Sequence, residues 1–311
     1  APRQDTSIGG WGRRTPEPVQ LEFGGWLDFA TRPALKREIA AFKPQIVMTW
    51  MSRASSFCPR PNQAVPFVQV GRLGGYYKLK YFNRCKYLIG NTPDIVDYIK
   101  RQDWLPEYAH YLPNFVDAMQ GEPVPRALLD TPAGIPLLLG LGRLHRNKGF
   151  DVLLRALKEI PGAYLWLAGA GDEETALKRL ARDLDVASRV RFLGWREDVA
   201  ALLAACDVFV CPSRHEPLGN VVIEAWSAGR PVVAARAAGP EALIRDGETG
   251  LLAPVNDAVA LARAVKRLLA EPALRARLAE QGCKAYAAQF TEAAVVAQYR
   301  AFFERVAAEV L

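Results

Sequence analysis

Residues 208–224 read Val-Phe-Val-Cys-Pro-Ser-Arg-His-Glu-Pro-Leu-Gly-Asn-Val-Val-Ile-Glu. The first four residues are apolar, which favours a short buried strand, and the last five favour the start of a helix. A polar loop that contains a glycine joins the two. Strand, loop and helix in this order, repeated along the chain, are typical of a parallel sheet that is covered by helices on both faces.

The same order recurs on both sides of this stretch and predicts two series of units. In the first series we expect strands at residues 19–23, 46–50, 67–70, 87–89 and 110–112. Helices are expected between them at 33–42, 76–84 and 93–101. In the second series we expect strands at 137–140, 164–168, 190–193, 208–211, 232–234 and 251–253. The helices of this series are expected near 149–159, 173–183, 197–205, 220–228, 239–244 and 257–270.

A Pro-containing link over residues 113–136 separates the two series. We therefore predict an α/β fold of two Rossmann-like domains, at 1–117 and 118–290, with a cleft between them. Ligands of such sheets bind at the carboxyl ends of the strands. The last segment, 291–311, contains one amphipathic helix, which we expect to pack back on the N-terminal domain.

The composition excludes several classes of protein. The chain has 311 residues, of which 50% are hydrophobic and 23% charged, as in ordinary globular proteins. No apolar run is long enough for a membrane-spanning helix, and no export signal is present. The five cysteines form no paired framework, and the three histidines cannot complete a zinc site. We expect a reduced, cytoplasmic protein without a structural metal.

Positive charge is concentrated in the first third of the chain. Residues 1–117 hold 16 Lys and Arg against 10 Asp and Glu, whereas 118–311 hold 24 against 23. Five cations and no acid lie in one short segment: Arg72, Lys78, Lys80, Arg84 and Lys86. Aromatic residues are interleaved with them, which suits an anionic membrane surface or a single-stranded nucleic acid. The alternative is a solvated helix whose aromatic side chains face inward.

A first candidate site follows the strand at 137–140. Residues 140–149 read Gly-Leu-Gly-Arg-Leu-His-Arg-Asn-Lys-Gly, and Arg143 and Lys148 could hold a diphosphate from two sides. The spacing fits neither a Walker loop nor a dinucleotide fingerprint. The alternative is a solvated turn.

A second candidate site lies in the quoted stretch. Leu218, Gly219 and Asn220 would open the helix and present unpaired N–H groups, which form an anion site. Glu216 before them and Glu224 after them suit the recognition of sugar and ribose hydroxyls. The alternative is that Glu216 is a charge favoured by the helix dipole and that Glu224 lies on the helix surface.

Taken together, the motifs of the last two-thirds of the chain resemble the retaining glycosyltransferases of family 4, which have the GT-B fold. The motifs are the Glu216/Glu224 pair, Gly142-Arg143 with Lys148-Gly149, and the stretches at 167–171, 190–194, 212–213, 228–233 and 247–251. The stretch at 113–117 looks like the interdomain segment of the family.

The resemblance implies a role for each matching residue. Arg143 and Lys148 would hold the donor diphosphate, Glu216 would meet the donor sugar and Glu224 the ribose. The turn between the two glutamates would offer backbone N–H groups to the donor. Trp195 and Arg196 would line the base pocket. The predicted donor-binding set is completed by Gly142, Gly169, Leu218, Gly219, Asn220 and Val221.

The N-terminal third departs from the family pattern twice. The chain begins near what looks like the third strand of the family. In many relatives the strand at 66–70 is followed by a histidine near the reacting sugar; here the sequence is Gly71-Arg72-Leu73-Gly74-Gly75. Arg72 can supply a cation but cannot act as a base, because its pKa is too high. On the acceptor or membrane side we place Arg53, with Ser55 and Ser56 nearby, and Arg72, Gly74, Lys78 and Lys80.

The sequence thus predicts a retaining glycosyltransferase that uses a nucleotide-diphosphate sugar and needs neither a cofactor nor a metal. Front-face displacement needs no protein base, because the leaving phosphate can take the proton of the acceptor. The expected acceptor is a glycan or lipid-linked glycan of the cell envelope, such as lipopolysaccharide, at the inner face of a membrane. One alternative is a nucleotide-sugar-binding module that has lost transfer activity. Binding to nucleic acid is disfavoured because residues 118–311 are almost neutral.

Overall fold

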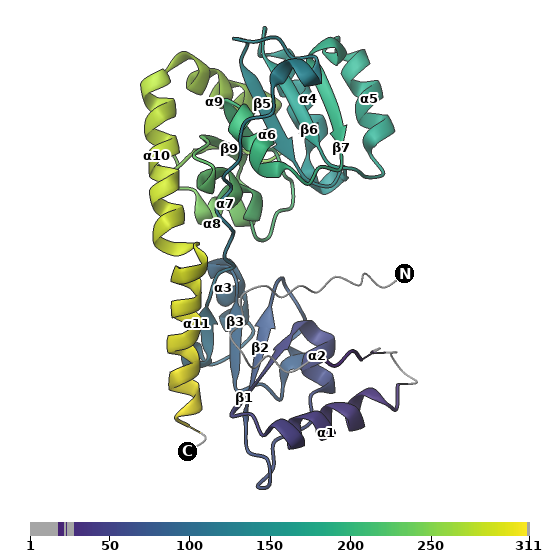
Figure 1. The fold of residues 1–311 in the computed structure, drawn as a ribbon, viewed down its shortest axis with the longest axis vertical. Helices are drawn as coiled ribbons and strands as arrows, with labels where there is room; N and C mark the ends of the chain where they lie inside the picture. The colour runs from purple at the N-terminus through teal and green to yellow at the C-terminus, as the bar shows by residue number, and fades with distance from the viewer. Residues whose placement is uncertain (1–17, 22, 24–27, 310–311) are drawn as a thin grey trace.

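The computed structural model of the chain describes residues 18–21, 23 and 28–309. Within these residues the chain forms two parallel sheets, one above the other in Figure 1. The lower sheet has the strand order β1-β2-β3-β4, with bounds Ile46–Trp50, Val68–Leu73, Tyr87–Gly90 and Ala109–Tyr111. Its helices are α1 (Thr31–Phe42), α2 (Met51–Phe57) and α3 (Pro93–Arg101), with 3₁₀ turns η2 (Leu79–Phe82) and η3 (Pro106–Tyr108).

The upper sheet has six described strands in the order β10-β9-β8-β5-β6-β7. The bounds are β5 Leu137–Leu141, β6 Tyr164–Ala168, β7 Val190–Gly194, β8 Val208–Cys211, β9 Val232–Ala235 and β10 Leu251–Ala253. The helices around it are α4 Phe150–Lys158, α5 Glu174–Asp183, α6 Val199–Ala205, α7 Asn220–Ser227, α8 Ala238–Leu243 and α9 Ala258–Ala270. The 3₁₀ turns are η4 Arg126–Leu129, η5 Arg146–Lys148 and η6 Ala187–Arg189.

Residues of one strand alternate between two cores, because successive side chains of a strand point to opposite faces. In β5, Leu138 belongs to the cluster that also holds Leu153 of α4 and Leu261 of α9. Its neighbours Leu137 and Leu139 belong to the cluster that holds Trp226 of α7. Both faces of the upper sheet are therefore buried, which explains why its strands read as continuous apolar runs.

The end of the chain connects the two halves. Helix α10 (Pro272–Gln289) packs on α7, and α11 (Glu292–Ala307) lies along the lower sheet (Figure 1). Phe302 and Val306 of α11 share a buried cluster with Val70 of β2. The expectation that the last helix packs on the N-terminal part is confirmed. The chain passes between the halves twice, near Val116 and near Phe290. A hydrogen bond joins the two segments, since the Val116 N–H donates to the Phe290 carbonyl at 3.1 Å.

Helix starts follow local sequence signals. The Thr92 side chain accepts a hydrogen bond from the Ile95 N–H at the start of α3, where Pro93 occupies the first turn. Asp257 and Thr291 cap α9 and α11 in the same way. Each cap satisfies an N–H group that has no partner inside its helix.

Two expectations for the N-terminal part were wrong, and one element was not predicted. The described residues of 19–23 lie in no strand. The predicted helix at 76–84 is only the 3₁₀ turn η2 (Leu79–Phe82), whose last residue is buried in the core. Conversely, the sequence interpretation did not expect α2 after β1.

No helix in the described part of the chain is both long enough and apolar enough to cross a bilayer.

Candidate active site

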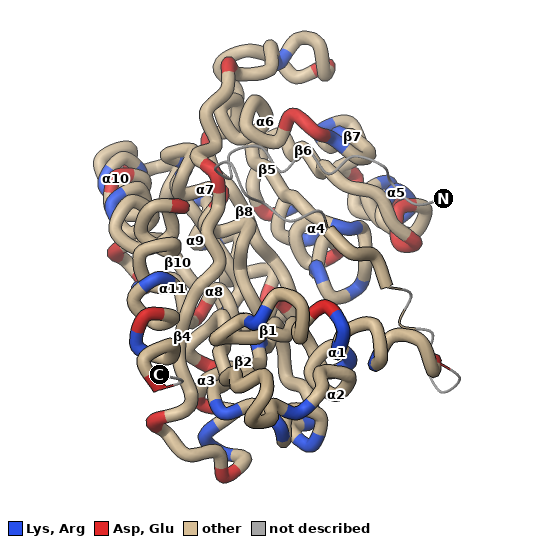
Figure 2. The backbone as a smooth tube through the Cα atoms, turned by 60° about the horizontal axis from the view of Figure 1, so that its bottom comes forward, with Lys and Arg blue, Asp and Glu red and all other residues tan. Residues whose placement is uncertain are grey.

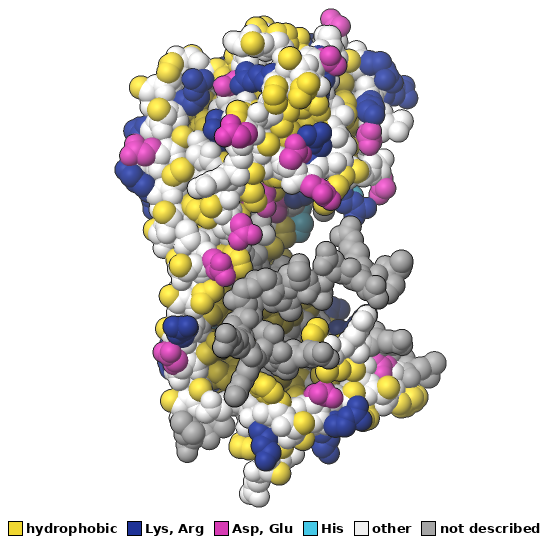
Figure 3. Space-filling model, viewed as in Figure 1, with side chains coloured by type: hydrophobic (Ala, Val, Ile, Leu, Met, Phe, Trp, Pro, Cys, Tyr) yellow, Lys and Arg dark blue, Asp and Glu magenta, His cyan; other side chains and the backbone are white. Residues whose placement is uncertain are grey.

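The central strands of the upper sheet, β5 and β8, are neighbours. From β5 the chain continues to β6 and β7 on one side, and from β8 it continues to β9 and β10 on the other. The loops after β5 (142–149) and after β8 (212–219) therefore leave the sheet in opposite directions at a topological switch point, where ligands of such sheets bind. The two candidate stretches of the sequence meet at this point. In the space-filling view, charged side chains gather along the lower margin of the upper half, on the side away from α10 and α11 (Figure 3).

Backbone contacts hold the two loops together. Gly149 has φ 66°, and a Cβ atom there would lie 2.1 Å from the Pro212 carbonyl oxygen. The carbonyl of Asn147 accepts hydrogen bonds from the backbone N–H groups of Arg214 at 2.7 Å and His215 at 3.1 Å. Only glycine allows this approach, so the separation of the two loops is fixed by the backbone.

A third loop joins them after β6. Gly169 has φ 145°, and a Cβ atom there would lie 1.9 Å from the Gly142 carbonyl oxygen. The Gly169 N–H donates to the Gly194 carbonyl at 2.7 Å. Gly142 itself leaves room for Lys148, whose Cε would lie 3.3 Å from an added Cβ. The structure thus gives both predicted glycines a packing role at the edge of the site.

Lys148 and Glu216 form an ion pair at the centre of the site. The exposed fraction of the side chain is 25% for Lys148 and 10% for Glu216. The second carboxylate oxygen of Glu216, Oε1, lies 3.4 Å from the backbone nitrogen of Gly219, which donates to it. The sequence predicted both charged residues at the donor, and the structure brings them into direct contact.

Helix α7 starts beside this pair. Gly219 caps it with φ 72°, and the first intrahelical bond is donated by the Val222 N–H. No described residue accepts a hydrogen bond from the N–H groups of Asn220 and Val221, and such groups carry the positive end of the helix dipole. The predicted anion site at the start of this helix therefore lies next to Lys148.

Glu224 lies in the second turn of α7 and is half-buried. Burial raises the pKa of its carboxyl group, the negative charge of Glu216 raises it further, and Lys148 partly offsets both. The two glutamates and the lysine therefore act on one another through space. Among the described residues, no group donates a hydrogen bond to the Glu224 side chain, so its carboxylate is available to a ligand.

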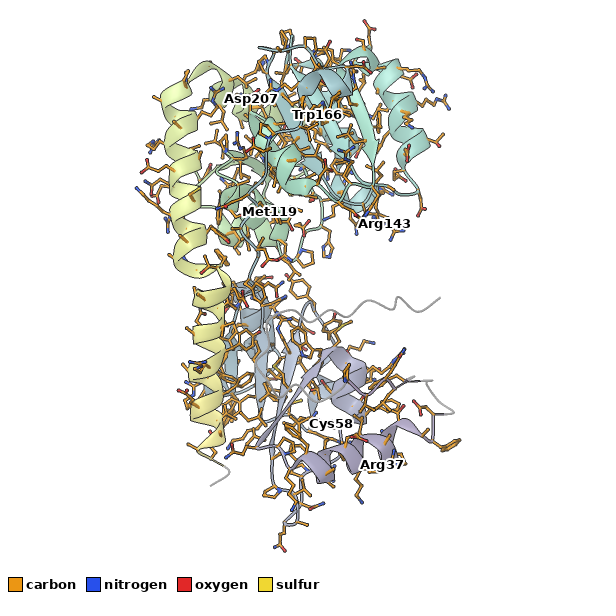
Figure 4. The ribbon with its side chains drawn as sticks, viewed as in Figure 1. Arg37, Cys58, Met119, Arg143, Trp166 and Asp207 are labelled. Carbon is orange, nitrogen blue, oxygen red and sulfur yellow. The ribbon has the colours of Figure 1, made fainter. Side chains whose placement is uncertain are left out.

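The other predicted donor residues lie at the margin of the site. Arg143 is at the cleft-facing end of the upper half (Figure 4), exposed, with Asp172 as its ion-pair partner at 3.3 Å. Trp195 follows β7 and is 76% exposed, so its ring face is open to a stacking partner. The guanidinium of Arg196 is bonded to both carboxylate oxygens of Asp198, at 2.7 and 2.5 Å.

Known proteins with similar sequences identify the family. A family model described as Glycosyl transferases group 1 matches residues 135–271. The lipopolysaccharide core biosynthesis glycosyltransferase LpsE of Rhizobium meliloti (strain 1021) is 42% identical over 258 residues, 83% of this chain and 75% of LpsE. The chain belongs to the group 1 glycosyltransferases. LpsD of the same organism, which has the same description, is 38% identical over 89% of this chain and 80% of its own.

Solved structures confirm the GT-B fold that was predicted for this glycosyltransferase. Sucrose-phosphate synthase from Thermosynechococcus elongatus is 26% identical, with a TM-score of 0.76 over 89% of this chain and 77% of its own. HepE of Anabaena, in complex with UDP, has a TM-score of 0.79 over 88% and 82% of the two chains at 22% identity. At that identity the likeness to HepE shows the fold alone.

In this group 1 glycosyltransferase, a further arginine braces the loop after β8, and the sequence interpretation gave it no role. The Arg214 guanidinium donates to both carboxylate oxygens of Asp151 in α4, at 2.6 and 2.7 Å, and to Asn256 at 2.5 Å. Burial raises the pKa of the Asp151 carboxyl group, but the hydrogen bonds and charge of Arg214 more than offset this and lower it overall. Arg214, two residues before the loop glutamate, was the available signal, but its partners are distant in sequence.

The structure divides the basic segment 72–86. Lys78 and Lys80 are exposed, whereas Arg72 is buried at the end of β2. Arg84 donates to the Cys58 carbonyl at 2.8 Å, and Lys86 pairs with Glu309 of the last turn at 2.6 Å. Arg84 and Lys86 are therefore bonded within the protein, whereas for Arg72, Lys78 and Lys80 a membrane or acceptor contact stays a prediction. Figure 2 shows Lys and Arg positions around α2, β2 and α3 of this half.

The remaining acceptor-side residues surround the carboxyl edge of the lower sheet. Arg53 of α2 is exposed and donates to the Phe23 carbonyl at 3.3 Å. Gly74 follows β2 and is half-buried. Ser55 is fully buried and bonded to Thr49 at 2.9 Å, so it cannot contact an acceptor. The two halves meet above this edge, where Leu218 packs against the cluster of α3 and β3.

Proposed function

We propose that the protein transfers a sugar from a nucleotide-diphosphate sugar, with retention, to a glycan or lipid-linked acceptor in lipopolysaccharide core synthesis. The names of LpsE and LpsD, which cover most of this chain, support the pathway and the acceptor class. Structures of HepE in complex with UDP and with UDP-glucose support the class of donor. We propose a cytoplasmic place of action, on the side of the membrane where nucleotide sugars are available.

One observation carries the proposal: the Lys148–Glu216 pair lies at the switch point, directly beside the start of α7. When the glycosidic bond breaks, negative charge builds on the leaving diphosphate. The Lys148 ammonium and the N–H groups at 220–221 stabilise that charge, and Arg143 reaches the same end of the upper half. Glu216 is already oriented by Lys148 and by the Gly219 N–H, so it is positioned to accept from a sugar hydroxyl.

Retention follows in this proposal from attack on the face that the diphosphate leaves. The acceptor hydroxyl gives its proton to the leaving phosphate oxygen, so no protein base is needed. An arginine such as Arg72 cannot serve as that base. No cofactor is needed, and the cations of the protein take the role that a divalent metal would have at the diphosphate. Transfer in the presence of EDTA at the rate seen without it is the expected result.

We also propose that the protein contacts the membrane peripherally through Lys78, Lys80 and the ring of Tyr81. The two lysines are exposed, and 41% of Tyr81 is exposed, with the Lys80 ammonium 5.2 Å from its ring centroid. Exposed cations beside an aromatic ring suit an anionic lipid surface. This contact would bring a lipid-linked acceptor close to the cleft.

A panel of UDP-, GDP- and ADP-sugars tests the proposal. A donor at a hundred times its Kd should raise the free energy of unfolding by about 2.7 kcal/mol, so thermal shift identifies it. Release of the nucleoside diphosphate should then require a core glycolipid acceptor, and NMR of the product should show the anomeric configuration of the donor. Nucleotide binding without transfer to any core acceptor would contradict the proposed reaction.

A further inference from the structure

A pocket of about 620 Å³ opens at the carboxyl edge of the lower sheet, outside the Lys148–Glu216 pair described above. It lies between the ends of β1 and β2, the interdomain segment and α11. Most of its walls are apolar side chains, among them Met48, Phe115 and Phe303. The start of α7 also reaches it through Asn220, so the pocket adjoins the proposed donor site.

The pocket contains a buried cation. Arg72 is only 6% exposed, its Nε donates to the Tyr299 hydroxyl at 2.8 Å, and its Nη2 donates to Oδ1 of Asn114. The ring of Trp50 stacks on the guanidinium, with its centroid 4.2 Å from Cζ. All three partners are neutral, and no carboxylate in the described ranges forms an ion pair with Arg72.

A guanidinium has five N–H donors, and the described residues accept from two of them. Buried cations are almost always paired with an anion, because a charge that is removed from water without a partner is strongly destabilised. The cation–π contact with Trp50 compensates for only part of this. Arg72 therefore provides a fixed positive fork whose described partners are all neutral.

The rim of the pocket is apolar as well. Three of the large hydrophobic side chains that the structure leaves exposed line it: Trp50 at 53%, Phe115 at 45% and Val296 at 44%. Such side chains, gathered at one hollow, mark a binding surface. Arg300 and Glu304 of α11 also line the pocket, are both exposed and carry opposite charges, so Arg72 sets the net charge inside.

We propose that this pocket binds an amphiphilic acceptor by an oxyanion, a phosphate or carboxylate group, held by Arg72, with the apolar part of the acceptor against Trp50 and α11. The inference rests on the proposed function, whose acceptor class it narrows. Asn114 links Arg72 to the donor side, because its Oδ1 accepts from Arg72 and its Nδ2 donates to Oδ1 of Asn220 at 3.3 Å. An acceptor anchored here would be held beside the first residue of α7.

Calorimetry with three probes tests the inference, with the donor site filled by saturating nucleoside diphosphate. The probes are octyl phosphate, octyl glucoside and inorganic phosphate, all below micelle-forming concentrations. Octyl phosphate should bind the wild-type protein about ten-fold more tightly than either other probe, because only it offers both the anion and the chain. Equal affinity for octyl phosphate and octyl glucoside would overturn the role of the anion. Equal affinity for octyl phosphate and inorganic phosphate would overturn the proposal that the ligand is an amphiphile.

Variants locate the site. Arg72→Gln should remove the preference for octyl phosphate, whereas Arg37→Gln, the same charge change on exposed α1, should keep it. Should Arg72→Gln fail to fold, Val296→Trp, which fills the pocket from its exposed rim, should abolish octyl phosphate binding. Undiminished binding in Val296→Trp would contradict the assignment. Nucleoside diphosphate binding without octyl phosphate binding would contradict this inference alone, whereas absence of nucleoside diphosphate binding would contradict the proposed function.

Discussion

The carboxyl edges of the two sheets are built in different ways. At the upper edge, loops are joined backbone to backbone, as at Gly149 and Pro212, and the central charges are paired, as in Lys148–Glu216. At the lower edge, the central charge is Arg72, which has neutral partners and faces an apolar pocket. The central charge has an ionic partner at the upper edge and only neutral described partners at the lower edge.

The two edges also differ in what fixes their shape. The donor side depends on glycines that tolerate no side chain, so its shape is fixed by the backbone. The proposed acceptor side is assembled from side chains of β1, β2, the interdomain segment and α11. Those side chains can change without moving the loops at 142–149 and 212–219. Substitutions should therefore separate the two edges cleanly.

The largest effect is expected from Gly149→Ala. The new Cβ would lie 2.1 Å from a backbone oxygen at a positive φ, so the two donor loops must move apart. We expect a loss of about 3–5 kcal/mol in the free energy of unfolding, from the strained backbone and the overlap together. Gly134→Ala is the matched control, since φ is also positive but nothing lies within 4 Å, and should cost about 1–2 kcal/mol. Urea denaturation measures both, and equal losses would show that the contact at Pro212 does not matter.

The two glutamates should differ in kinetics. Glu216→Gln should lower kcat about a hundred-fold with a smaller change in donor affinity, if its bond to the sugar strengthens as the glycosidic bond breaks. Glu224→Gln should mainly weaken donor binding, because the ribose does not react. Steady-state kinetics with the identified donor separates the two variants. Reversed phenotypes would show that the two roles are assigned the wrong way round.

Most of the upper half could be predicted from the sequence. The strands β6, β8 and β10 have the predicted bounds, because each is a short apolar run between polar turns. The glycine-containing loops could be recognised in the sequence because the residues of each motif are contiguous. What the sequence did not reveal there was the pairing of Arg214 with Asp151, since 63 residues separate the two.

The lower half was harder to predict for a physical reason. The number of cations in residues 72–86 indicated an anionic partner. A count does not distinguish an exposed lysine from Arg84, whose guanidinium donates to the Cys58 carbonyl after α2. The partners of Arg72 lie at Asn114 and Tyr299, up to 227 residues away. Long-range side-chain contacts of this kind follow from the fold and leave no local pattern.

Membrane binding should depend on the two exposed lysines. Lys78→Glu/Lys80→Glu should reduce co-sedimentation with anionic vesicles at low salt, by about 1 kcal/mol for each lysine lost, and high salt should weaken the binding of the wild-type protein. Lys36→Glu/Lys43→Glu makes the same charge change at exposed positions on and after α1 and should have the smaller effect. Equal binding by both double variants would mean that only net charge matters.

The smallest effect is a change in the pH dependence of stability at Glu224. Its pKa is raised by burial and by Glu216, so the unfolded chain loses the proton first as pH rises. Stability is therefore lost between the ordinary pKa of a glutamate and the raised one, and the loss persists above it. Glu224→Gln should raise Tm at about pH 8 and leave it unchanged at about pH 3, well below the ordinary pKa. Exposed Glu197→Gln is the control, and an equal rise in both variants would contradict the burial argument.

The account depends most on the place of the donor diphosphate between Lys148 and the start of α7. The direct test is to titrate wild type and Lys148→Ala with the nucleoside diphosphate that the donor panel identifies and with its parent nucleoside. Removal of Lys148 should raise the diphosphate Kd about a hundred-fold, because Glu216 then faces the phosphates unpaired, and should change the nucleoside Kd by less than about three-fold. Exposed Lys158→Ala at the end of α4 should leave both unchanged. Equal losses for diphosphate and nucleoside in Lys148→Ala, or no loss for either, would contradict the account.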